Sequence, residues 1–289
     1  FPTLFPYIKM MYGEPASLYL NRGLSIESEQ GAYQGDPLSP FLFALTIHDV
    51  IKKAKDRFPL AIYAYCDDVT VAGEDIDRVQ ECMAFLRDEL KESGLETNMD
   101  KSKIYLRSVE ASTEDREEAP SAGKEDEDSM ENFPVEFSSG FRCMGGYIGT
   151  NYFVNNSITQ YINEVREIGA SLSQFSADGY AHEAFTLLRM CLVPKYSHIL
   201  RLHDSEVVGG AHEYFDWVIR EIFANILGLD QSHFAFWQHE SVHLPIKKGG
   251  FGLPKASTTG KWAYIASLME SLKLIRHRCS HGSSVVNGI

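Results

Sequence analysis

The sequence predicts an α+β protein in which a region of mixed helices and strands precedes an almost wholly helical region. Up to about residue 150, apolar side chains recur with alternating helical and strand periods, whereas the patterns from about residue 155 onward are helical. The chain has 289 residues, 44% of them hydrophobic, which is enough for two hydrophobic cores. We therefore expect two domains, residues 1–154 and residues 155–289.

Composition narrows the class of protein. No run of 18 apolar residues is present, which argues against a membrane span, and no leader pattern precedes the first helix, which predicts an intracellular protein. The five cysteines form no CxxC pair, so a disulfide framework and a structural zinc site lack support. Apolar side chains already fill residues 2–11, so we expect a fragment whose upstream part is missing.

Charge is unevenly distributed along the chain. The net charge is −13, but residues 110–131 hold ten acids and two bases, so they contribute 2 − 10 = −8 and leave −13 + 8 = −5 for the rest. That stretch has no apolar period, and we interpret residues 108–134 as a solvated, disordered insertion in the first domain. The net charge of −13 argues against simple nucleic-acid binding, whereas the remaining excess of −5 is mild and says little about partners.

The first region contains a sequence of recognisable elements. A helix is expected from an Asp36-Pro37 start to the Phe58-Pro59 stop. Two short strands, residues 60–65 and 69–72, flank Cys66-Asp67-Asp68 and predict a tight hairpin. An amphipathic helix over residues 76–90 should end before Gly94. A strand over residues 104–106 and a hairpin over residues 141–148 complete the region.

The second region shows four helical stripes. They cover residues 158–172, 184–191, 211–222 and 262–269, and Pro194 is expected to stop the second. A helical bundle fits this pattern. Trp217, Trp237 and Trp262 fall within helical patterns and are predicted to belong to the core.

The most informative feature for function is Tyr65-Cys66-Asp67-Asp68 at the hairpin tip. Two adjacent acids repel one another unless a cation lies there, and carboxylates with substrate phosphates suit Mg²⁺. Strand alternation predicts that Tyr63, Tyr65 and Asp67 share one face, with Asp68 turned aside. Taken alone, the feature is better explained as a turn in which Asp suits the backbone.

Two further loops contain residues suited to phosphates. Residues 30–40 place two glycines and a Gln before a helix N-terminus, where free N–H groups attract anions and Gly35 permits close approach. Lys101 follows a tight turn in residues 94–103 and could meet a phosphate. Each alone is more simply a capped loop or a surface lysine.

Taken together, in this order and spacing, these pieces resemble the reverse transcriptase family, most closely the non-LTR retrotransposon type. The matching blocks are QGDPLSP at residues 34–40, AYCDDV at 64–69, GLETNMDKS at 94–102 and the hairpin at 141–149, with Met144 in place of the usual Leu. Residues 2–17 and 244–253 are similar to further family blocks. The first four blocks cover residues 1–150, and the helical remainder would be thumb and connection.

The resemblance implies a polymerase palm, an antiparallel sheet with packed helices, followed by an all-α thumb or connection region. It implies RNA-directed DNA synthesis by two-metal chemistry with Mg²⁺ or Mn²⁺, an RNA template, a DNA primer and dNTPs as partners, and a nuclear location. The implied residues are Asp67 and Asp68 as metal ligands and catalytic groups with Lys101; Gln34, Gly35, Pro37, Tyr65 and Asn98 at the substrate; and Phe141, Met144 and Gly145 in the primer grip.

One departure from the family pattern leaves two hypotheses open. Family members carry a further catalytic Asp upstream of the first helix, and no such block is present here, so the chain itself is expected to be inactive. The alternative is a polymerase remnant that binds RNA or protein as a scaffold. A hydrolase finds no support, because no GxSxG or HExxH motif occurs. The cluster His277, Cys279 and His281 is better explained as a polar tail than as a metal knuckle.

Overall fold

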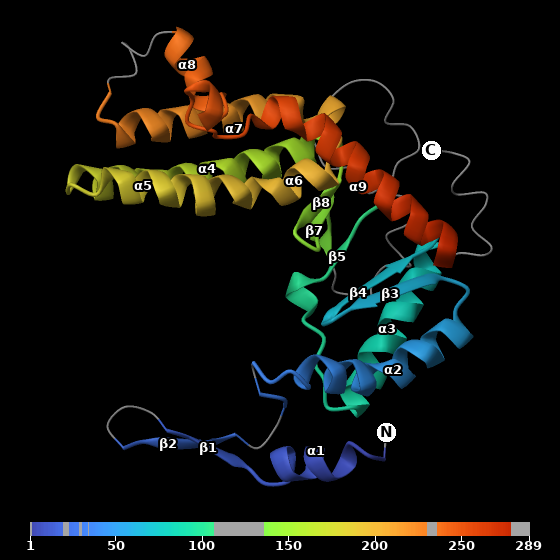
Figure 1. The fold of residues 1–289 in the computed structure, drawn as a ribbon. Coiled ribbons are helices and arrows are strands. Elements are labelled where there is room, and N and C mark those ends of the chain that lie inside the picture. Colours follow the sequence, from blue (N-terminus) through green and yellow to red (C-terminus); the bar gives the residue numbers. More distant parts are fainter. Residues whose placement is uncertain are drawn as a thin grey trace. The chain divides into compact units, whose positions relative to one another are not determined.

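The computed structural model describes residues 2–19, 23–28, 31–33, 35–106, 136–229 and 236–278. The described residues up to Ser102 form one compact unit, and those from Lys103 onward form a second. We call them the amino-terminal and carboxy-terminal units. The predicted fold class, α+β with a following helical region, is confirmed (Figure 1). The domain division at residue 154 stays a prediction, and Gln34, the acidic insertion 108–134, Cys279 and His281 lie outside the described residues.

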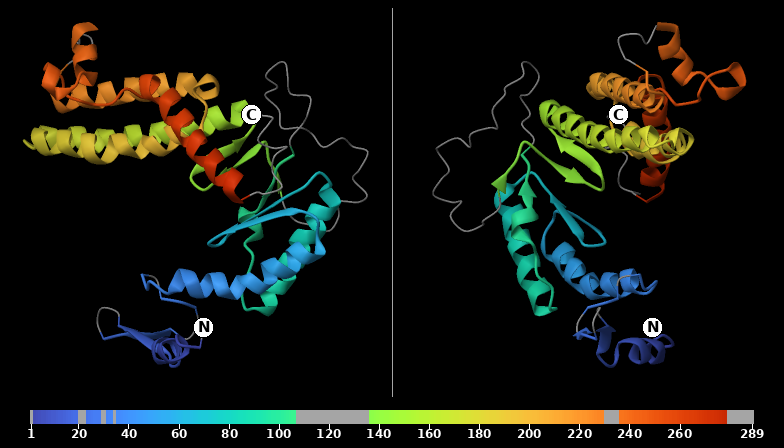
Figure 2. Two further views of the ribbon diagram at one scale, coloured as in Figure 1. Left: turned by 45° about the vertical axis from the view of Figure 1, so that its right-hand side comes forward. Right: turned by 90° about the vertical axis from the view of Figure 1, so that its left-hand side faces the viewer.

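The amino-terminal unit contains three helices, two hairpins and a short 3₁₀ turn among its described residues. In chain order the elements are α1 (Phe5–Tyr12), β1 (Ala16–Tyr19), β2 (Ser25–Ser28), α2 (Ser39–Arg57), β3 (Ala61–Tyr65), β4 (Asp68–Ala72), α3 (Ile76–Glu92) and η1 (Met99–Lys101). The β3–β4 hairpin packs on α2 and α3 (Figure 2). The buried core of the unit comes from α2 and its C-cap residue, from β3 and from α3: Val50, Ala54, Phe58, Ile62, Cys82 and Leu86.

The segment before α2 differs from the prediction. Residues 2–11 were expected to be buried, but none of α1 is buried, and Phe5 and Met10 are 64% and 71% exposed. After α1 the chain forms the antiparallel β1–β2 hairpin, in which Leu18 pairs with Ile26 and both side chains are exposed. Sequence periodicity missed this hairpin because it has no buried face to impose alternation.

The start of α2 also requires a correction. Asp36 is not the N-cap, because the helix begins at Ser39 and its N-cap is Leu38. The Asp36 carboxylate instead accepts the Leu38 N–H at 3.0 Å, two residues along the chain, which is an Asx turn. Pro40, rather than Pro37, occupies the first turn of the helix.

The predicted end of α3 before Gly94 is confirmed, and its start has an N-cap that the sequence analysis did not assign. The side chain of Asp75 accepts the N–H groups of Asp77 and Arg78 and caps the first turn. At the other end, Leu95 N–H donates to the Leu90 carbonyl and Gly94 N–H to that of Lys91, the bond pair of a Schellman motif. Gly94 has φ +78°, a conformation that glycine adopts without steric cost.

The carboxy-terminal unit is a helical bundle with small β elements at its start. In chain order the elements are β5 (Lys103–Ile104), β6 (Glu136–Phe137), β7 (Gly140–Cys143), β8 (Gly146–Gly149), α4 (Asn151–Ala177), α5 (Ala181–Leu187), the π turn η2 (Leu188–Leu192), η3 (Val193–Tyr196), α6 (Ser197–Leu202), α7 (Ser205–Ile226), α8 (Phe236–His243), η5 (Ile246–Lys248) and α9 (Ala256–Arg278). The predicted strand at 104–106 is realised only as the two-residue β5, which pairs in parallel with β6.

Helices α4 and α7 form the centre of this bundle and lie side by side (Figure 1). Gly169 of α4 permits the close approach, because a Cβ there would lie 2.2 Å from Cδ1 of Ile222 on α7. Buried apolar side chains from both helices, from the α5–α6 segment and from the start of α9 make one continuous core. Burial of this area supplies the main stabilisation of the unit.

A buried carboxylate joins α7 to α9. Asp216 on α7 is 2% exposed, and its carboxylate accepts the Ala256 N–H at 2.6 Å, the Ser257 N–H at 3.0 Å and the Ser257 hydroxyl at 2.6 Å. These N–H groups belong to the first turn of α9, where they have no partner within the helix. Asp216 therefore caps α9 across the bundle, where negative charge is also favoured by the helix dipole.

Two predictions for the bundle are wrong. Pro194 does not stop a helix, because the chain continues through a π turn and a 3₁₀ turn into α6. Trp217 and Trp262 are not core residues, being 40% and 69% exposed, since their stripes position them at the edge of the bundle. Among the described residues, no helix is long and apolar enough to cross a membrane.

Candidate active site

The two acidic residues singled out in the sequence lie at the tip of the β3–β4 hairpin, as predicted. Tyr65 pairs with Asp68 across the hairpin, so Cys66 and Asp67 form a two-residue turn. Cys66 adopts φ +50°, a region that non-glycine residues seldom occupy and that two-residue hairpins use. The tight turn holds the two carboxylates in consecutive positions at the tip of the hairpin.

The strand register places Asp68, rather than the predicted Asp67, on the hairpin face that carries Tyr63 and Tyr65. Residues paired across an antiparallel hairpin project to the same face, so Asp68 lies on the face of Tyr65 and of the Tyr63–Thr70 pair. The prediction that Asp67 shares this face and that Asp68 turns aside is wrong, because β3 ends at Tyr65 and the alternation stops there. The opposite face, which carries Ile62, packs against the core.

The face with Asp68 is open to solvent. Tyr63 and Tyr65 are 67% and 61% exposed, and both carboxylates of the turn are exposed. Within the described residues, neither Asp67 nor Asp68 forms a hydrogen bond or an ion pair that would offset their mutual repulsion. The hairpin tip is therefore a site of uncompensated negative charge beside two aromatic rings.

The donor set at the tip fits a magnesium or manganese ion. Mg²⁺ in phosphate-transfer sites is held by one or two carboxylates, with water and substrate phosphates filling the other positions. Asp67 and Asp68 supply two hard oxygen donors, and no group of three or more metal-binding side chains is found in the part of the chain that the structure describes. Two carboxylates are thus available to an ion that also needs oxygens from a substrate.

The loop before α2 is fixed by a tyrosine that sequence patterns did not assign. The Tyr12 hydroxyl donates to the Asp36 carboxylate, and its ring stacks on Tyr33 with centroids 4.9 Å apart. The Ser39 hydroxyl donates to the Tyr33 carbonyl at 2.6 Å. The Tyr12 hydroxyl, followed by the Leu38 N–H, lowers the pKa of Asp36, which favours its charged form. Asp36 is therefore engaged in holding the loop.

The predicted substrate residues of this loop lie on its exposed side. Gly35 has φ +92° and a Cβ there would meet no atom within 4 Å, so the backbone at Gly35 is open to a ligand. Pro37 is exposed next to it. A side chain at Gly35 would be strained by the backbone angle rather than by crowding.

The loop after α3 holds its predicted residues in a short turn. The Asn98 side chain accepts the Lys101 N–H at 3.1 Å and caps η1, while the Ser102 hydroxyl donates to the Asn98 carbonyl at 2.9 Å. Lys101 is exposed. Asn98 thus has a structural role in orienting Lys101, and the role of either residue at a substrate stays a prediction.

The predicted primer-grip residues belong to the carboxy-terminal unit. In the β7–β8 hairpin Phe141 pairs with Ile148, and the turn residues Met144 and Gly145 have φ +48° and +81°. Positive φ at both turn positions matches a type I′ hairpin turn. Glycine adopts this conformation without steric cost at the second position, whereas Met144 is an uncommon residue at the first. Met144 is 55% exposed, so the turn presents its side chain to solvent.

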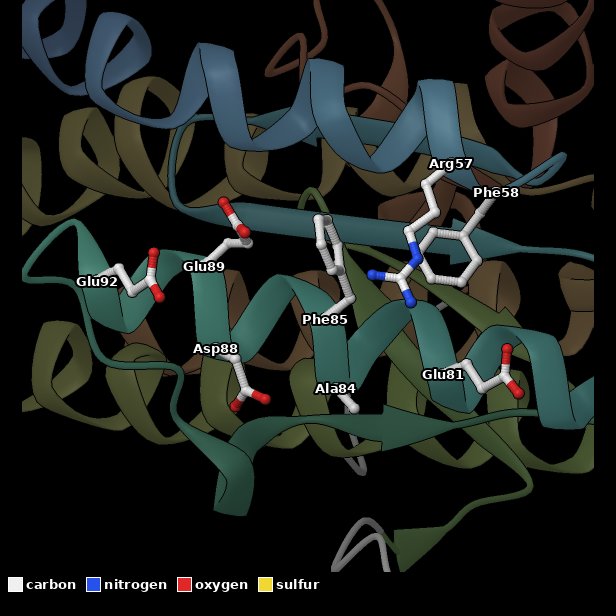
Figure 3. Close-up of a pocket in the computed structure, with 8 residues that line it drawn as sticks. All are labelled: Arg57, Phe58, Glu81, Ala84, Phe85, Asp88, Glu89 and Glu92. Carbon is white, nitrogen blue, oxygen red and sulfur yellow. The ribbon is translucent and has the colours of Figure 1, made fainter.

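A hollow between the end of α2 and α3 does not suit a triphosphate (Figure 3). Four acidic side chains line it with Arg57 and the apolar residues Phe58, Ala84 and Phe85: Glu81, Asp88, Glu89 and Glu92. The Arg57 guanidinium lies over the rings of Phe58 and Phe85 at 5.2 and 4.9 Å. The four acidic side chains would repel the phosphates of a nucleotide.

Comparisons with known proteins bear on the same part of the chain. Residues 1–137 match the family described as reverse transcriptase (RNA-dependent DNA polymerase). The chain is similar to the retrotransposable element SLACS 132 kDa protein of Trypanosoma brucei gambiense, with 22% identity over 82% of the chain and 18% of that protein. It is also similar to the retrovirus-related Pol polyprotein from type-1 retrotransposable element R2 of Nasonia vitripennis, with 26% identity over 81% of the chain and 22% of that protein.

These matches cover most of this chain but little of the other proteins. The chain spans about a fifth of the length of the curated relatives it matches. No solved structure matches the chain. The similarity therefore concerns one region of larger retrotransposon proteins.

Proposed function

We propose that the chain, whose residues 1–137 match the reverse transcriptase family, is the palm and thumb portion of a retrotransposon RNA-directed DNA polymerase. The reaction is template-directed addition of dNTPs to a primer 3′-hydroxyl. The observation that carries the proposal is the two-residue turn that holds Asp67 next to Asp68 at the exposed tip of the hairpin. An RNA template, a DNA primer and dNTPs are the partners it implies.

The hairpin supplies the groups that a nucleotidyl transfer needs. Divalent ions at such a site activate the primer hydroxyl and neutralise charge on the triphosphate. Asp67 and Asp68 would hold such ions through their exposed carboxylate oxygens, and the two-residue turn places both residues at the tip before substrate arrives. Tyr65, on the same face as Asp68, packs against the primer end.

Two loops of the amino-terminal unit act on the nucleotide. The open backbone at Gly35 lets a nucleotide or template approach the loop that Tyr12 and Asp36 hold. The family resemblance implies that Gln34 and Pro37 act at the same substrate. Lys101 extends from a capped turn and meets the triphosphate, where it can protonate the leaving pyrophosphate. Each of these roles is assigned through the family resemblance.

The decisive experiment replaces the proposed ligand without changing its shape. We expect Asp67→Asn to reduce primer extension by the intact polymerase that contains this chain by roughly a thousandfold, since a lost metal ligand costs several kcal/mol at the transition state. Asp56→Asn is the matched control, because Asp56 is an exposed acid on α2. Near-normal extension by the Asp67 variant would remove the catalytic assignment.

A scaffold function is the alternative, and metal binding separates the two. Only two acidic donors meet at the tip in the described part of the chain, and the family pattern contains a third, so we expect the chain alone to be inactive in extension. A polymerase site must still bind Mg²⁺ more tightly when dNTP is present, whereas a scaffold needs no Mg²⁺. Calorimetric titration of the chain with MgCl₂, with and without dNTP, distinguishes these outcomes.

A further inference from the structure

Two histidines of one helical segment contact the backbone of the β7–β8 hairpin. His198 lies in α6 and His203 is its C-cap residue. The Nε2 atom of His198 lies 2.9 Å from the Met144 carbonyl oxygen at the turn. The Tyr147 N–H donates to Nε2 of His203 at 3.3 Å. The hairpin is therefore held at its turn and again on β8.

The two contacts use the same ring atom in opposite roles. A carbonyl oxygen can only accept, so Nε2 of His198 must carry a proton to bond Met144. A backbone N–H can only donate, so Nε2 of His203 must be unprotonated to bond Tyr147. Burial, with His203 only 9% exposed, keeps that imidazole neutral and lowers its pKa, and the nearby His212 and His198 add to this effect.

The hairpin backbone lies directly against α6 at two glycines. A Cβ at Gly145 would lie 3.1 Å from Nε2 of His198, and one at Gly146 would lie 2.6 Å from Cδ1 of Leu202. The His203 ring also stacks on Tyr147, with centroids 6.1 Å apart and an interplanar angle of 27°. The hairpin is therefore fixed on α6 by three kinds of contact: the close backbone approach, two hydrogen bonds and one ring stack.

The exposed side of the turn is the part left for a ligand. Met144 has 55% of its surface accessible while its carbonyl is held from behind by His198. We infer that His198 and His203 are positioning residues that fix the β7–β8 turn as a rigid edge against the primer end. This inference rests on the proposed polymerase function, because the primer role of the hairpin is one that the resemblance to polymerases of this family implies.

The first test measures, in this chain, how well the hydrogen bond to His203 protects the Tyr147 amide from exchange. His203→Phe keeps a ring to stack on Tyr147 but removes the acceptor, so the Tyr147 amide should exchange with solvent about fivefold faster, the worth of one net hydrogen bond. His182→Phe on α5 is the matched control, because His182 is exposed and should leave that exchange unchanged. Unchanged exchange in His203→Phe would overturn the inference.

The second test measures primer positioning in the intact polymerase. His198→Leu removes the donor to Met144, and His198→Gln keeps an amide donor. We expect His198→Leu to lower the rate of single-nucleotide addition at saturating primer and template about tenfold, with the KM for dNTP unchanged, because a displaced primer end loses alignment. His198→Gln should restore most of the rate, whereas a general loss of folding would not separate rate from KM.

The outcomes separate this inference from the function on which it rests. A normal addition rate in His198→Leu, together with loss of extension in Asp67→Asn, would refute the histidine role and leave the polymerase standing. Normal extension in Asp67→Asn would refute the catalytic site, while the exchange of Tyr147 would still decide whether His203 holds the hairpin. If His203→Phe does not fold, the two His198 variants give the same decision.

Discussion

Removing the carboxylate that caps α9 should destabilise the carboxy-terminal unit more than any surface acid. In Asp216→Ala the buried Ala256 N–H loses its acceptor, and so do the N–H and the hydroxyl of the exposed Ser257. A buried unsatisfied donor costs about 1–3 kcal/mol, and a lost helix cap costs about 1 kcal/mol. Because these terms overlap, we expect a loss of about 2–4 kcal/mol in the free energy of unfolding.

The assay can follow this unit alone. All three tryptophans, Trp217, Trp237 and Trp262, belong to the carboxy-terminal unit, so their fluorescence reports its unfolding by heat or urea. For a unit of this size the predicted loss lowers Tm by roughly 10 °C. Asp216→Asn keeps one acceptor oxygen and should lose about half as much.

A matched variant makes the result decisive. Glu213 lies on the same helix as Asp216 but is exposed, so Glu213→Ala should change the free energy of unfolding by less than about 0.5 kcal/mol. If Asp216→Ala is as stable as Glu213→Ala, the carboxylate does not hold α9 and the account of this contact is wrong.

Three further predictions concern packing and charge. Gly169→Ala should cost about 1–3 kcal/mol by the same fluorescence assay, because its Cβ would push on Ile222, and a stable variant would refute the close contact. Tyr12→Phe should raise the pKa of Asp36 toward its ordinary value, measured by NMR of the carboxyl carbon; an unchanged pKa would show that the hydroxyl is not its partner. Burial lowers the pKa of three histidines in the carboxy-terminal unit: His203, His212 and His243. Below the ordinary value of 6.5 the unfolded chain binds more protons at these sites than the folded chain, so Tm should fall between pH 7.5 and 5.5, and an equal or higher Tm at pH 5.5 would contradict the burial.

The parts of the fold that sequence predicts well are those with local causes. Gly94 ends α3 because a residue in the left-handed conformation acts within one turn of the chain. The hairpins around residues 66–67 and 144–145 follow from short turns between β-prone runs. The order of the family blocks directed attention to the same turns.

The parts that sequence could not predict depend on pairing or on distant partners. Which acid shares a face with Tyr65 is set by where β3 ends, and a shift of one residue reverses the answer. The cap on α9 comes from Asp216, forty residues earlier than Ala256. His198 and His203 belong to no motif, and a helix of alternating apolar residues gives no sign that a hairpin lies against it.

The hydrogen bond between Tyr12 and Asp36 joins two residues that the sequence analysis treated separately. Tyr12 belongs to residues 2–17, which resemble a family block, and the hydroxyl group of Tyr12 bonds Asp36, which follows the β1–β2 hairpin in the chain. Asp36 in turn was interpreted as a helix cap, because Asp before Pro commonly starts a helix. Spacing along the chain does not show that the two side chains meet.

The segment between α5 and α6 contains two irregular helical turns, one wider and one tighter than an α turn. The π turn at Leu188–Leu192 takes one residue more than an α turn, and the 3₁₀ turn at Val193–Tyr196 takes one fewer. The second turn offsets the change in helical phase made by the first, and the segments on either side keep buried residues, Ala184 before the turns and Ile199 after them. Deleting a single residue from either turn would rotate everything after it by about 100° and turn both hairpin-binding histidines away from β7–β8. The length of this segment is therefore less free to change than its composition.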